Sequence, residues 1–236
     1  MDDAPEQSSM SDRAPMPDQA PIDVDLIADL ACPWCYLGLV RLDRARAMRP
    51  DRPVRLRWWP FLLNPQLPPE GMDRAAYLRT KFGGDASARQ IYQRIVESAR
   101  EDGLELAFER MTRTPNTVLA QRLILFAEQH GRAEALIRVL FRALFQEGRD
   151  IGDPETLQEL AESAGLDRAE TGRLLGGQAL AKDVVVAHQR AERLGVRGVP
   201  VFVVDREQAI SGAQPPEVLA GLIDVATAAR QAPAAG

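Results

Sequence analysis

The chain has 236 residues, of which 45% are hydrophobic and 27% are charged, and its formal net charge is -5 at pH 7. This composition excludes fibrous, disordered and disulfide-scaffold proteins for the body of the chain, and the acidic balance argues against a nucleic-acid-binding protein. The length suits one large domain, or a core domain with an inserted second unit.

We expect neither an export signal nor a membrane span. Residues 1–20 begin with Met and two Asp and contain no apolar run, whereas a secretory signal needs a basic start and an apolar stretch. No later window approaches the ~20 consecutive apolar residues that cross a bilayer, so we expect a soluble, cytoplasmic protein. In that reducing compartment, a close cysteine pair is more often catalytic or metal-binding than structural.

The first predicted strand lies at 22–30, where apolar residues alternate with mostly acidic ones. This period of two is typical of a β-strand. The segment 31–50 then places apolar residues at helical spacing until Pro50 ends the run. A second alternating segment at 54–61 predicts another strand, and the order strand, helix, strand indicates a βαβ unit.

The middle of the chain is predicted to be helical. From about 73 to 194, every segment with a clear period is helical, and no strand candidate is found there. The clearest helical patterns lie at 88–101, 116–130 and 132–147. Asp153 before Pro154 predicts a further helix start, because Asp caps helices and Pro suits the first helical position. Glycine is common just after a helix, and the predicted helix ends are Gly131, Gly148, Gly165 and Gly195.

The period of two returns in the segment 199–211. Two short strands at 201–204 and 208–210 can pair across a turn at Asp205 and Arg206. A final helix is predicted at 216–229, which completes a ββα unit.

The predicted fold class is therefore α/β, with two small halves separated by an all-helical insertion. The βαβ half covers 21–65, the insertion covers 66–195 and the ββα half covers 196–230. The ends, 1–20 and 231–236, are rich in Ala, Pro and Gln, and we expect disordered tails there.

Both cysteines of the chain lie in the motif Cys32-Pro33-Trp34-Cys35, at the junction between the first strand and the following helix. Residues three apart on a helix have Cβ atoms about 5–6 Å apart, and a tighter first turn brings them to the ~3.8 Å that a disulfide needs. The free N–H groups and the dipole at a helix start favour an anion. We therefore expect Cys32 to be a thiolate at neutral pH, with a pKa below the ~8.5 of a free cysteine.

The two residues between the cysteines fit this position. Pro33 has no N–H to leave unsatisfied in the first turn of a helix. Trp34 is expected to be exposed beside the sulfurs, where its ring offers an apolar ledge to a partner.

A structural zinc site and a pair of buried, unreactive cysteines are the alternatives to a redox pair. A C-x-x-C motif supplies half of a zinc site, but the chain has no further cysteine to complete it. The histidines stand apart: we interpret His130 as a cation at a helix C-terminus and His188 as an exposed helical residue. The sequence thus predicts no metal site within one chain.

The ordered set of motifs resembles the DsbA family of thioredoxin-fold oxidoreductases, and in particular its FrnE-like branch. The resemblance spans about 22–225 and rests on five segments, which are CPWC at 32–35, PFLLNP at 60–65, PNT at 115–117, GVRGVPVFVV at 195–204 and ISGAQPPEVL at 210–219. It implies a thioredoxin-like fold with a helical insertion. It also implies thiol-disulfide exchange through a mixed disulfide, with no bound cofactor.

The resemblance assigns roles to individual residues. Cys32 is expected to be the nucleophile and Cys35 the resolving thiol, while Pro33 and Trp34 are expected to contact substrate. Val199-Pro200 is expected to be a cis peptide that faces the cysteine pair and leaves the Val199 backbone free to pair with an extended substrate. Asn116 either lines the active-site cleft or is an ordinary residue at a helix start.

The partners implied are a protein thiol or disulfide, or a small thiol, with glutathione as a candidate co-substrate. Pro33 and Trp34 add no cation beside Cys32, so we expect a weaker oxidant than family members with His in the dipeptide. In a reducing cytoplasm, reduction of substrates is at least as plausible as oxidative folding. The helical insertion could also provide the interface of a homodimer.

Two other functions remain open. Glutathione-dependent 2-hydroxychromene-2-carboxylate isomerases and kappa-class glutathione transferases resemble the same fold, and they act on small, often aromatic, molecules. They typically place Ser where Cys32 stands, and this chain departs from that pattern. A cleft between the core and the insertion could still hold a small molecule. The third reading is a non-catalytic module that binds peptides through Trp34 and the cleft.

Overall fold

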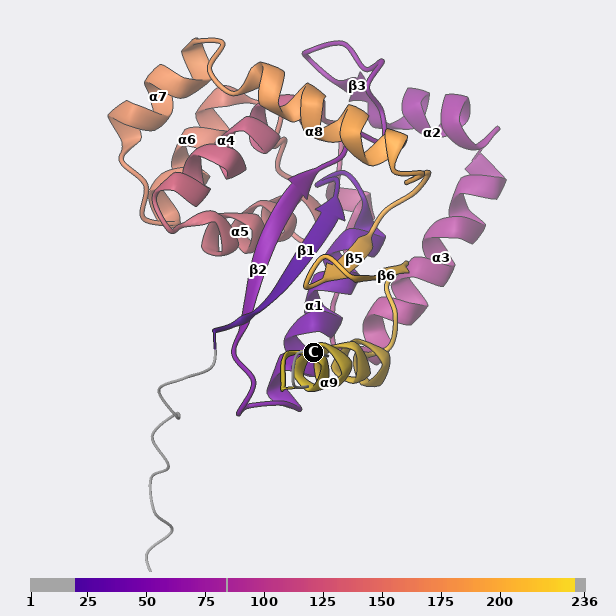
Figure 1. Cartoon of the computed structure of the whole chain (residues 1–236). Helices are drawn as coiled ribbons and strands as arrows, with labels where there is room; N and C mark the ends of the chain where they lie inside the picture. Colours follow the sequence, from indigo (N-terminus) through magenta and orange to yellow (C-terminus); the bar gives the residue numbers. More distant parts are fainter. Residues whose placement is uncertain (1–19, 84, 232–236) are drawn as a thin grey trace, which may run out of the picture.

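The computed structural model describes residues 20–83 and 85–231, so the predicted tails lie almost entirely outside the described residues. A four-stranded sheet crosses the middle of the molecule in the order β2-β1-β5-β6 (Figure 1). Its strands are β1 (Ile22–Ala28), β2 (Val54–Pro60), β5 (Val201–Val204) and β6 (Gln208–Ser211). β1 pairs in parallel with β2 and antiparallel with β5, and β5 pairs antiparallel with β6.

Two helices from opposite ends of the chain complete the core around this sheet. They are α1 (Pro33–Ala47) and α9 (Pro216–Gln231), which pack against each other. The alternating apolar residues of β1 are buried in the same core cluster as the apolar residues of both helices. The predicted βαβ and ββα arrangement is confirmed.

The remaining helices all lie between β2 and β5 in the sequence, as predicted, and they are grouped around the sheet (Figure 1). The elements of this insertion are β3 (Met72–Asp73), α2 (Arg74–Phe82), α3 (Asp85–Glu101), the 3-10 turn η1 (Phe108–Arg110), β4 (Arg113–Thr114), α4 (Val118–Gln129), α5 (Ala133–Phe145), α6 (Pro154–Ser163), α7 (Arg168–Gly176) and α8 (Ala181–Arg193).

The expectation that the insertion holds no strand is wrong. β3 and β4 form a two-stranded antiparallel ladder, in which Met72 faces Thr114 and Asp73 faces Arg113. Each strand has two residues, so neither is long enough to show an alternating pattern in the sequence. Only long-range pairing of the two segments reveals them.

The predicted punctuation of the helices is confirmed. The Asp153 side chain accepts a hydrogen bond from the Thr156 N–H at the start of α6. The four glycines predicted to end helices all have positive φ angles, which an L side chain rarely adopts. The turn between β5 and β6 runs through Asp205 and Arg206, whose φ angles of 48° and 64° are also positive.

Buried polar contacts join the insertion to the sheet. The Trp58 indole N–H on β2 donates to Gln121 Oε1 on α4 at 2.6 Å. The Gln121 amide nitrogen donates in turn to the carbonyl oxygens of Ala28 and Phe61, at 3.3 and 3.1 Å. Every polar atom of this buried amide is therefore used in fixing α4 against β1 and the end of β2.

None of the helices in the described ranges is long and apolar enough to span a bilayer.

Candidate active site

The two cysteines lie where the sequence predicts, at the first turn of α1. Cys32 is the N-cap residue of the helix, and Pro33 occupies its first position. The Cys32 N–H donates to the Asp29 carbonyl at 3.0 Å, and the Cys35 N–H donates to the Cys32 carbonyl at 3.0 Å. Both thiols are free; Cys32 is 5% exposed and Cys35 is 0% exposed. The thiols therefore differ in access as well as in position.

The Val199-Pro200 segment faces Cys32, as the resemblance implied. The Val199-Pro200 peptide bond is cis, and the Cys32 thiol donates to the Val199 carbonyl oxygen at an Sγ···O distance of 3.5 Å. α1 approaches this segment closely at Gly38, where an added Cβ would lie 3.2 Å from Pro200 Cγ. The missing side chain of Gly38 thus allows the helix and the Val199-Pro200 segment to meet.

Burial raises the pKa of the Cys35 thiol well above its usual value. The hydrogen bond and the charge of Cys32 raise it further, and so does the negative charge of Asp29. A hydrogen bond from the Asp29 backbone acts in the opposite direction. Cys35 is therefore held as a protonated thiol unless a nearby group accepts its proton.

Asp29, a buried carboxylate that the sequence analysis did not single out, lies next to this thiol. It is 1% exposed, and burial raises its pKa even though hydrogen bonds act to lower it. Its Oδ1 accepts from the Thr117 hydroxyl at 2.8 Å and from the Ala31 N–H at 3.1 Å. A signal was present, because Asp29 precedes the motif by three residues in a strand pattern that buries its neighbours.

The segment from Phe61 to Asn64 passes beside Asp29. The Phe61 N–H donates to the Ala28 carbonyl at 2.9 Å, and the Leu63 N–H donates to Asp29 Oδ2 at 2.6 Å. This segment belongs to the PFLLNP motif, and its backbone hydrogen bonds to Ala28 and Asp29 hold the motif near the cysteines.

His188 is buried, and the expectation of an exposed residue is wrong. It is 8% exposed, its Nδ1 accepts the Leu62 N–H at 3.3 Å, and its ring lies edge-on to Phe61 with centroids 4.7 Å apart. His188 lies on the same face of α8 as the buried Val184 and Ala191, and this face is too narrow to stand out among the exposed residues of the helix. His130 lies at the C-cap of α4, as predicted.

Asn116 and Thr117 lie at the entry to α4. The Asn116 amide nitrogen donates to the Leu67 carbonyl at 2.8 Å, and its oxygen accepts the Val118 N–H at 3.0 Å. Asn116 thus joins the segment at Leu67 to the start of α4, and α4 begins at Val118 rather than at residue 116. In the PNT motif, it is Thr117 that contacts a buried acid of the site.

Trp34 was expected to be exposed, but it is only partly exposed, because it packs against the main core cluster. Pro33 is partly buried as well.

Two cations of α2 lie near the site, one beside the segment 61–64 and the other beside Tyr92 on α3. Lys81 Nζ donates to Asn64 Oδ1 at 2.7 Å, and Arg74 donates to the Tyr92 hydroxyl at 2.7 Å. The Arg74 guanidinium also lies 5.0 Å from the centre of the Tyr92 ring. Among the described side chains, neither cation is paired with a carboxylate.

Two tyrosines connect these cations to the reaction centre. Burial raises the pKa of Tyr92, the charge and hydrogen bond of Arg74 act to lower it, and the charge of Cys32 acts to raise it. Burial likewise raises the pKa of Tyr77 to about 12, and the Tyr77 hydroxyl donates to Asn64 Oδ1 at 3.1 Å.

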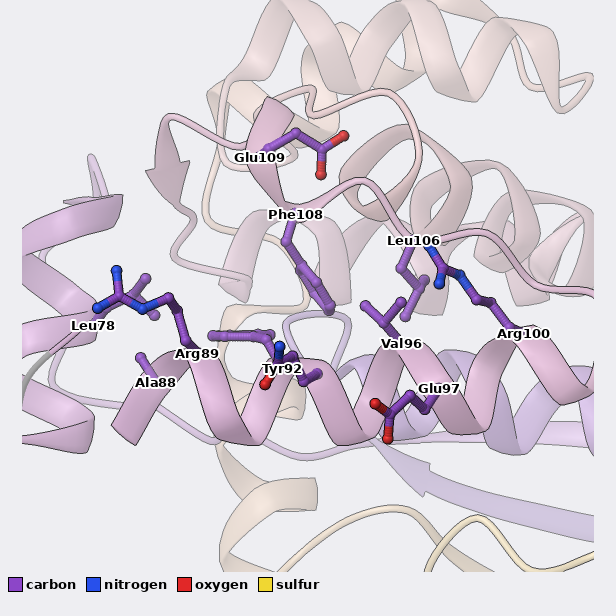
Figure 2. A pocket seen from close by; sticks show the side chains of 11 residues that line it. Leu78, Ala88, Arg89, Tyr92, Val96, Glu97, Arg100, Leu106, Phe108 and Glu109 are labelled. Atoms are coloured by element: carbon purple, nitrogen blue, oxygen red, sulfur yellow. The ribbon is translucent and has the colours of Figure 1, made fainter. Parts of the chain in front are cut away.

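Tyr92 is one of the residues that line a cavity of about 660 Å³. Figure 2 shows Phe108 pointing from η1 towards α3, with Leu106 lying opposite Val96. The rings of Tyr92 and Phe108 are 4.4 Å apart. Charged side chains, including Arg89 and Glu109, stand around these apolar residues. The cavity is lined by the insertion alone, rather than by the interface between insertion and core.

Within the described residues, no group of three or more His, Cys, Asp or Glu side chains is arranged as a set of metal ligands.

Comparisons with known proteins agree with this geometry. A sequence model of the DSBA-like thioredoxin domain matches residues 23–224. The chain is 33% identical to a probable DsbA oxidoreductase from Streptomyces coelicolor, and the match covers 88% of this chain and 90% of that one with a TM-score of 0.76.

Two more distant structures share the fold. One is the cytosolic disulfide reductase DsbM from Pseudomonas aeruginosa, solved with GSH, which is 21% identical with a TM-score of 0.63 over 87% of this chain and 99% of that one. The other is a 2-hydroxychromene-2-carboxylate isomerase, which is 18% identical with a TM-score of 0.64 over 89% and 97% of the two chains.

Proposed function

Because the chain belongs to the DSBA-like thioredoxin-domain family, we propose that it is a thiol-disulfide oxidoreductase with Cys32 as nucleophile and Cys35 as resolving thiol. The observation that carries this proposal is the asymmetry of the two thiols. Cys32 caps α1 and its sulfur meets the Val199 carbonyl, whereas Cys35 is wholly buried with a raised pKa. A nucleophile must reach the substrate, while a resolving thiol needs to reach only the nucleophile.

The reaction proceeds by two exchanges. The Cys32 thiolate attacks a substrate disulfide, a bond forms between Cys32 and one substrate sulfur, and the other substrate sulfur leaves as a thiolate. Cys35 then loses its proton and attacks Cys32, which releases the second substrate thiolate and leaves a Cys32-Cys35 disulfide. Two electrons have passed to the substrate. Two molecules of a thiol reductant restore the dithiol, and the reverse sequence oxidises a substrate dithiol.

Asp29 acts as the proton acceptor for Cys35 in this mechanism. Its charge acts on the Cys35 thiol, and its raised pKa brings it closer to that of the thiol than an exposed carboxylate would be. Its hydrogen bonds to Thr117, Leu63 and Ala31 hold the carboxylate in place.

The substrate side of the proposal includes Pro33, Trp34 and the Val199-Pro200 segment. Pro33 and Trp34 are partly exposed between the two thiols. The Val199 backbone can pair with an extended peptide at the point where Cys32 attacks. Asn116 would act on the substrate side indirectly, because its amide is engaged by Leu67 and Val118.

Glutathione, or another small thiol that carries carboxylates, is the proposed co-substrate. Arg74 and Lys81 have no carboxylate partner among the described side chains. They lie beside Tyr92 and Tyr77, whose pKa values are raised in part by the charges of Cys32 and Asp29. Two such cations favour an anionic ligand over a neutral one. We also propose that the protein is cytoplasmic and that it is a member of the FrnE-like branch.

Trapping of the mixed disulfide tests this function. We expect Cys32→Ser to abolish exchange, because no nucleophile remains, and Cys35→Ser to accumulate a mixed disulfide through Cys32. Mass spectrometry of each variant after incubation with oxidised glutathione or a disulfide peptide would detect the adduct, with the double variant as control. A Cys35→Ser protein that turns over disulfides at the wild-type rate contradicts the dithiol mechanism.

A titration in glutathione redox buffers measures the reduction potential of the cysteine pair, which determines the direction of electron transfer. With thiols counted by alkylation and tryptophan fluorescence followed in parallel, we expect a reversible two-electron transition. Its potential should be more negative than about -120 mV, the value of a strongly oxidising DsbA, because the dipeptide contributes no cation. A more positive value would contradict the expected weaker oxidant.

The cavity beside Tyr92 favours a second candidate function, a glutathione-dependent isomerase or transferase acting on a small aromatic molecule. Its apolar lining and charged rim suit such a ligand (Figure 2). The presence of Cys32 in place of Ser argues against it. Glutathione that binds without exchange, while both cysteines stay reduced in the titration, would favour this candidate.

A further inference from the structure

Two consecutive backbone N–H groups connect the buried His188 to the buried Asp29. The Leu62 N–H donates to His188 Nδ1 at 3.3 Å, and the Leu63 N–H donates to Asp29 Oδ2 at 2.6 Å. The two N–H groups belong to successive planar peptide units that meet at the Leu62 Cα, so anchoring the first unit on His188 leaves only the φ and ψ angles of Leu62 to orient the second. α8 is thereby linked to the carboxylate beside Cys35, although His188 and Asp29 share no hydrogen bond.

The hydrogen bond from Leu62 defines the state of the imidazole. A ring nitrogen that accepts a hydrogen bond carries no proton, so the proton of the neutral ring is on Nε2. Nε2 faces Glu192 Oε2 on the same helix at 3.7 Å. The second ionisable group near His188 is Asp29, whose pKa a positively charged imidazole would lower. The packed segment 61–63 contributes only Phe61, Leu62 and Leu63, none of which ionises.

We propose that His188 is a positioning residue, which accepts the Leu62 N–H and thereby holds the Leu63 N–H on the carboxylate of Asp29. The effect of His188 on turnover rests on the proposed function, in which Asp29 accepts the proton of Cys35. The hydrogen-bond chain itself can be measured without any turnover. Among the described residues, the hydrogen-bond, ion-pair and ring partners of His188 are Leu62, Glu192 and Phe61, so it is not a catalytic residue.

Replacement of the imidazole by a ring without an acceptor tests the chain of contacts. In His188→Phe the Leu62 N–H has no partner, so the segment relaxes and the Leu63 N–H binds Asp29 less well. This hydrogen bond stabilises the ionised carboxylate, and its weakening raises the pH midpoint of Asp29 by about 0.5–1 unit. Below the new midpoint, the attack of Cys35 on the mixed disulfide slows in proportion to the protonated fraction of Asp29.

The matched control keeps the acceptor. In His188→Asn the side-chain oxygen can take the place of Nδ1, so the midpoint of Asp29 should stay within about 0.3 units of the wild-type value. Both midpoints are read from the carboxyl ¹³C shift of labelled aspartate, which is assigned by its loss in Asp29→Asn. An unchanged midpoint in His188→Phe, or an equal shift in both variants, would overturn the proposal.

A measurement on the wild-type protein covers the case in which His188→Phe does not fold. In ¹⁵N-labelled protein, we expect a scalar coupling across the hydrogen bond between the Leu62 amide nitrogen and His188 Nδ1, and the ¹⁵N shift of an unprotonated Nδ1. An Nδ1-protonated ring with no coupling overturns the assignment. If Cys35→Ser traps no adduct but the Asp29 midpoint still shifts in His188→Phe, the proposed function fails and the positioning role stands.

Discussion

At the scale of the residue, the site is defined by two thiols and one acid, all buried, of which Cys32 is the most exposed at 5%. Cys35 and Asp29 are both almost fully enclosed, and burial raises the pKa of each. Since the charged form of either group is costly in this environment, the two groups disfavour being charged at the same time. That arrangement suits a resolving thiol, which must lose its proton only after the mixed disulfide has formed.

Asp29→Asn is expected to slow the second exchange step. An amide cannot accept the Cys35 proton, so release of substrate from the mixed disulfide should slow by about 10²-fold, the lower range for general-base catalysis. The first attack by Cys32 should change much less. Stopped-flow tryptophan fluorescence with a disulfide peptide separates the two steps. Equal slowing of both would contradict the assignment of Asp29 to Cys35.

The same variant tests the raised pKa of Asp29 through stability. A carboxyl whose folded pKa is raised binds its proton more tightly in the folded than in the unfolded protein. Its contribution is fully present below the unfolded pKa of ~3.9 and is lost as the pH rises through the folded pKa. Relative to Asp29→Asn, the wild-type protein should therefore lose stability across that window, as measured by urea unfolding. A constant difference between the two proteins would show that the pKa is not raised.

At the scale of the element, two close contacts set the geometry of the site. Gly38 lets α1 approach β5 and the Val199-Pro200 segment, and Gln121 attaches α4 to β2. Both contacts join segments that are distant in the sequence, so each one positions part of the active site.

Gly38→Ala is expected to separate α1 from the Val199-Pro200 segment. The added Cβ would lie 3.1 Å from Phe202 Cζ and 3.2 Å from Pro200 Cγ, which is too close without movement. Overpacking costs about 1–3 kcal/mol and alanine regains up to about 1 kcal/mol of helix propensity, so we expect a net loss of about 1 kcal/mol. Gly221→Ala on α9 is the control, because nothing lies within 4 Å of its added Cβ. Thermal unfolding in which both variants gain stability would contradict this account.

Gln121→Leu is expected to loosen the insertion from the sheet. The substitution leaves the Trp58 indole N–H buried without an acceptor and the Phe61 carbonyl without its amide donor, which costs about 2–4 kcal/mol in all. The control is Gln129→Leu on the same helix, an exposed position where a change stays within about 0.5 kcal/mol. The free energies come from urea unfolding followed by tryptophan fluorescence. Similar losses in both variants would contradict a special role for the Gln121 amide.

At the scale of the whole molecule, arginine-carboxylate pairs join the helices and strands. Arg49 on the C-terminal side of α1 binds Asp224 on α9, and Arg46 of α1 binds Glu134 on α5, each at 2.6 Å. The Arg49 hydrogen bond lowers the pKa of Asp224. Burial raises the pKa of Glu134, but the hydrogen bonds of its arginine partners more than offset this, and the net pKa is lowered.

The fold should therefore lose stability in acid. A carboxylate with a lowered folded pKa contributes stability above its unfolded pKa, about 3.9 for Asp and 4.3 for Glu, and this stability is lost as the pH falls through the folded pKa. Asp224, Glu134 and Asp23, whose pKa is lowered by its Arg55 hydrogen bond, act in this direction. In the Asp29→Asn background, which removes the opposite contribution of Asp29, urea unfolding should give a nearly constant midpoint from pH 7 to about 5 and a falling one below about 4. Glu134→Gln should flatten that fall, and a midpoint that rises steadily towards pH 3 would contradict it.

The sequence alone determined the order of elements and the position of the thiol pair. Alternation marks β1 and β2, and the junction between strand and helix places Cys32 at the start of α1, because these patterns reflect the local backbone. The resemblance supplied the cis bond at Val199-Pro200. Local patterns could not reveal β3 and β4, which consist of two residues each, and they misplaced His188 on the surface.

Tertiary structure alone decided what surrounds the thiols. Apart from the Val199-Pro200 segment, which the resemblance had placed opposite Cys32, Leu62 meets His188 across 126 positions of the sequence and Thr117 meets Asp29 across 88. Such contacts arise from packing, which brings together residues that carry no mutual signal in the chain. The same burial raises the pKa values of Asp29 and Cys35, because a shift of this kind depends on the low-dielectric surroundings that only the folded molecule creates.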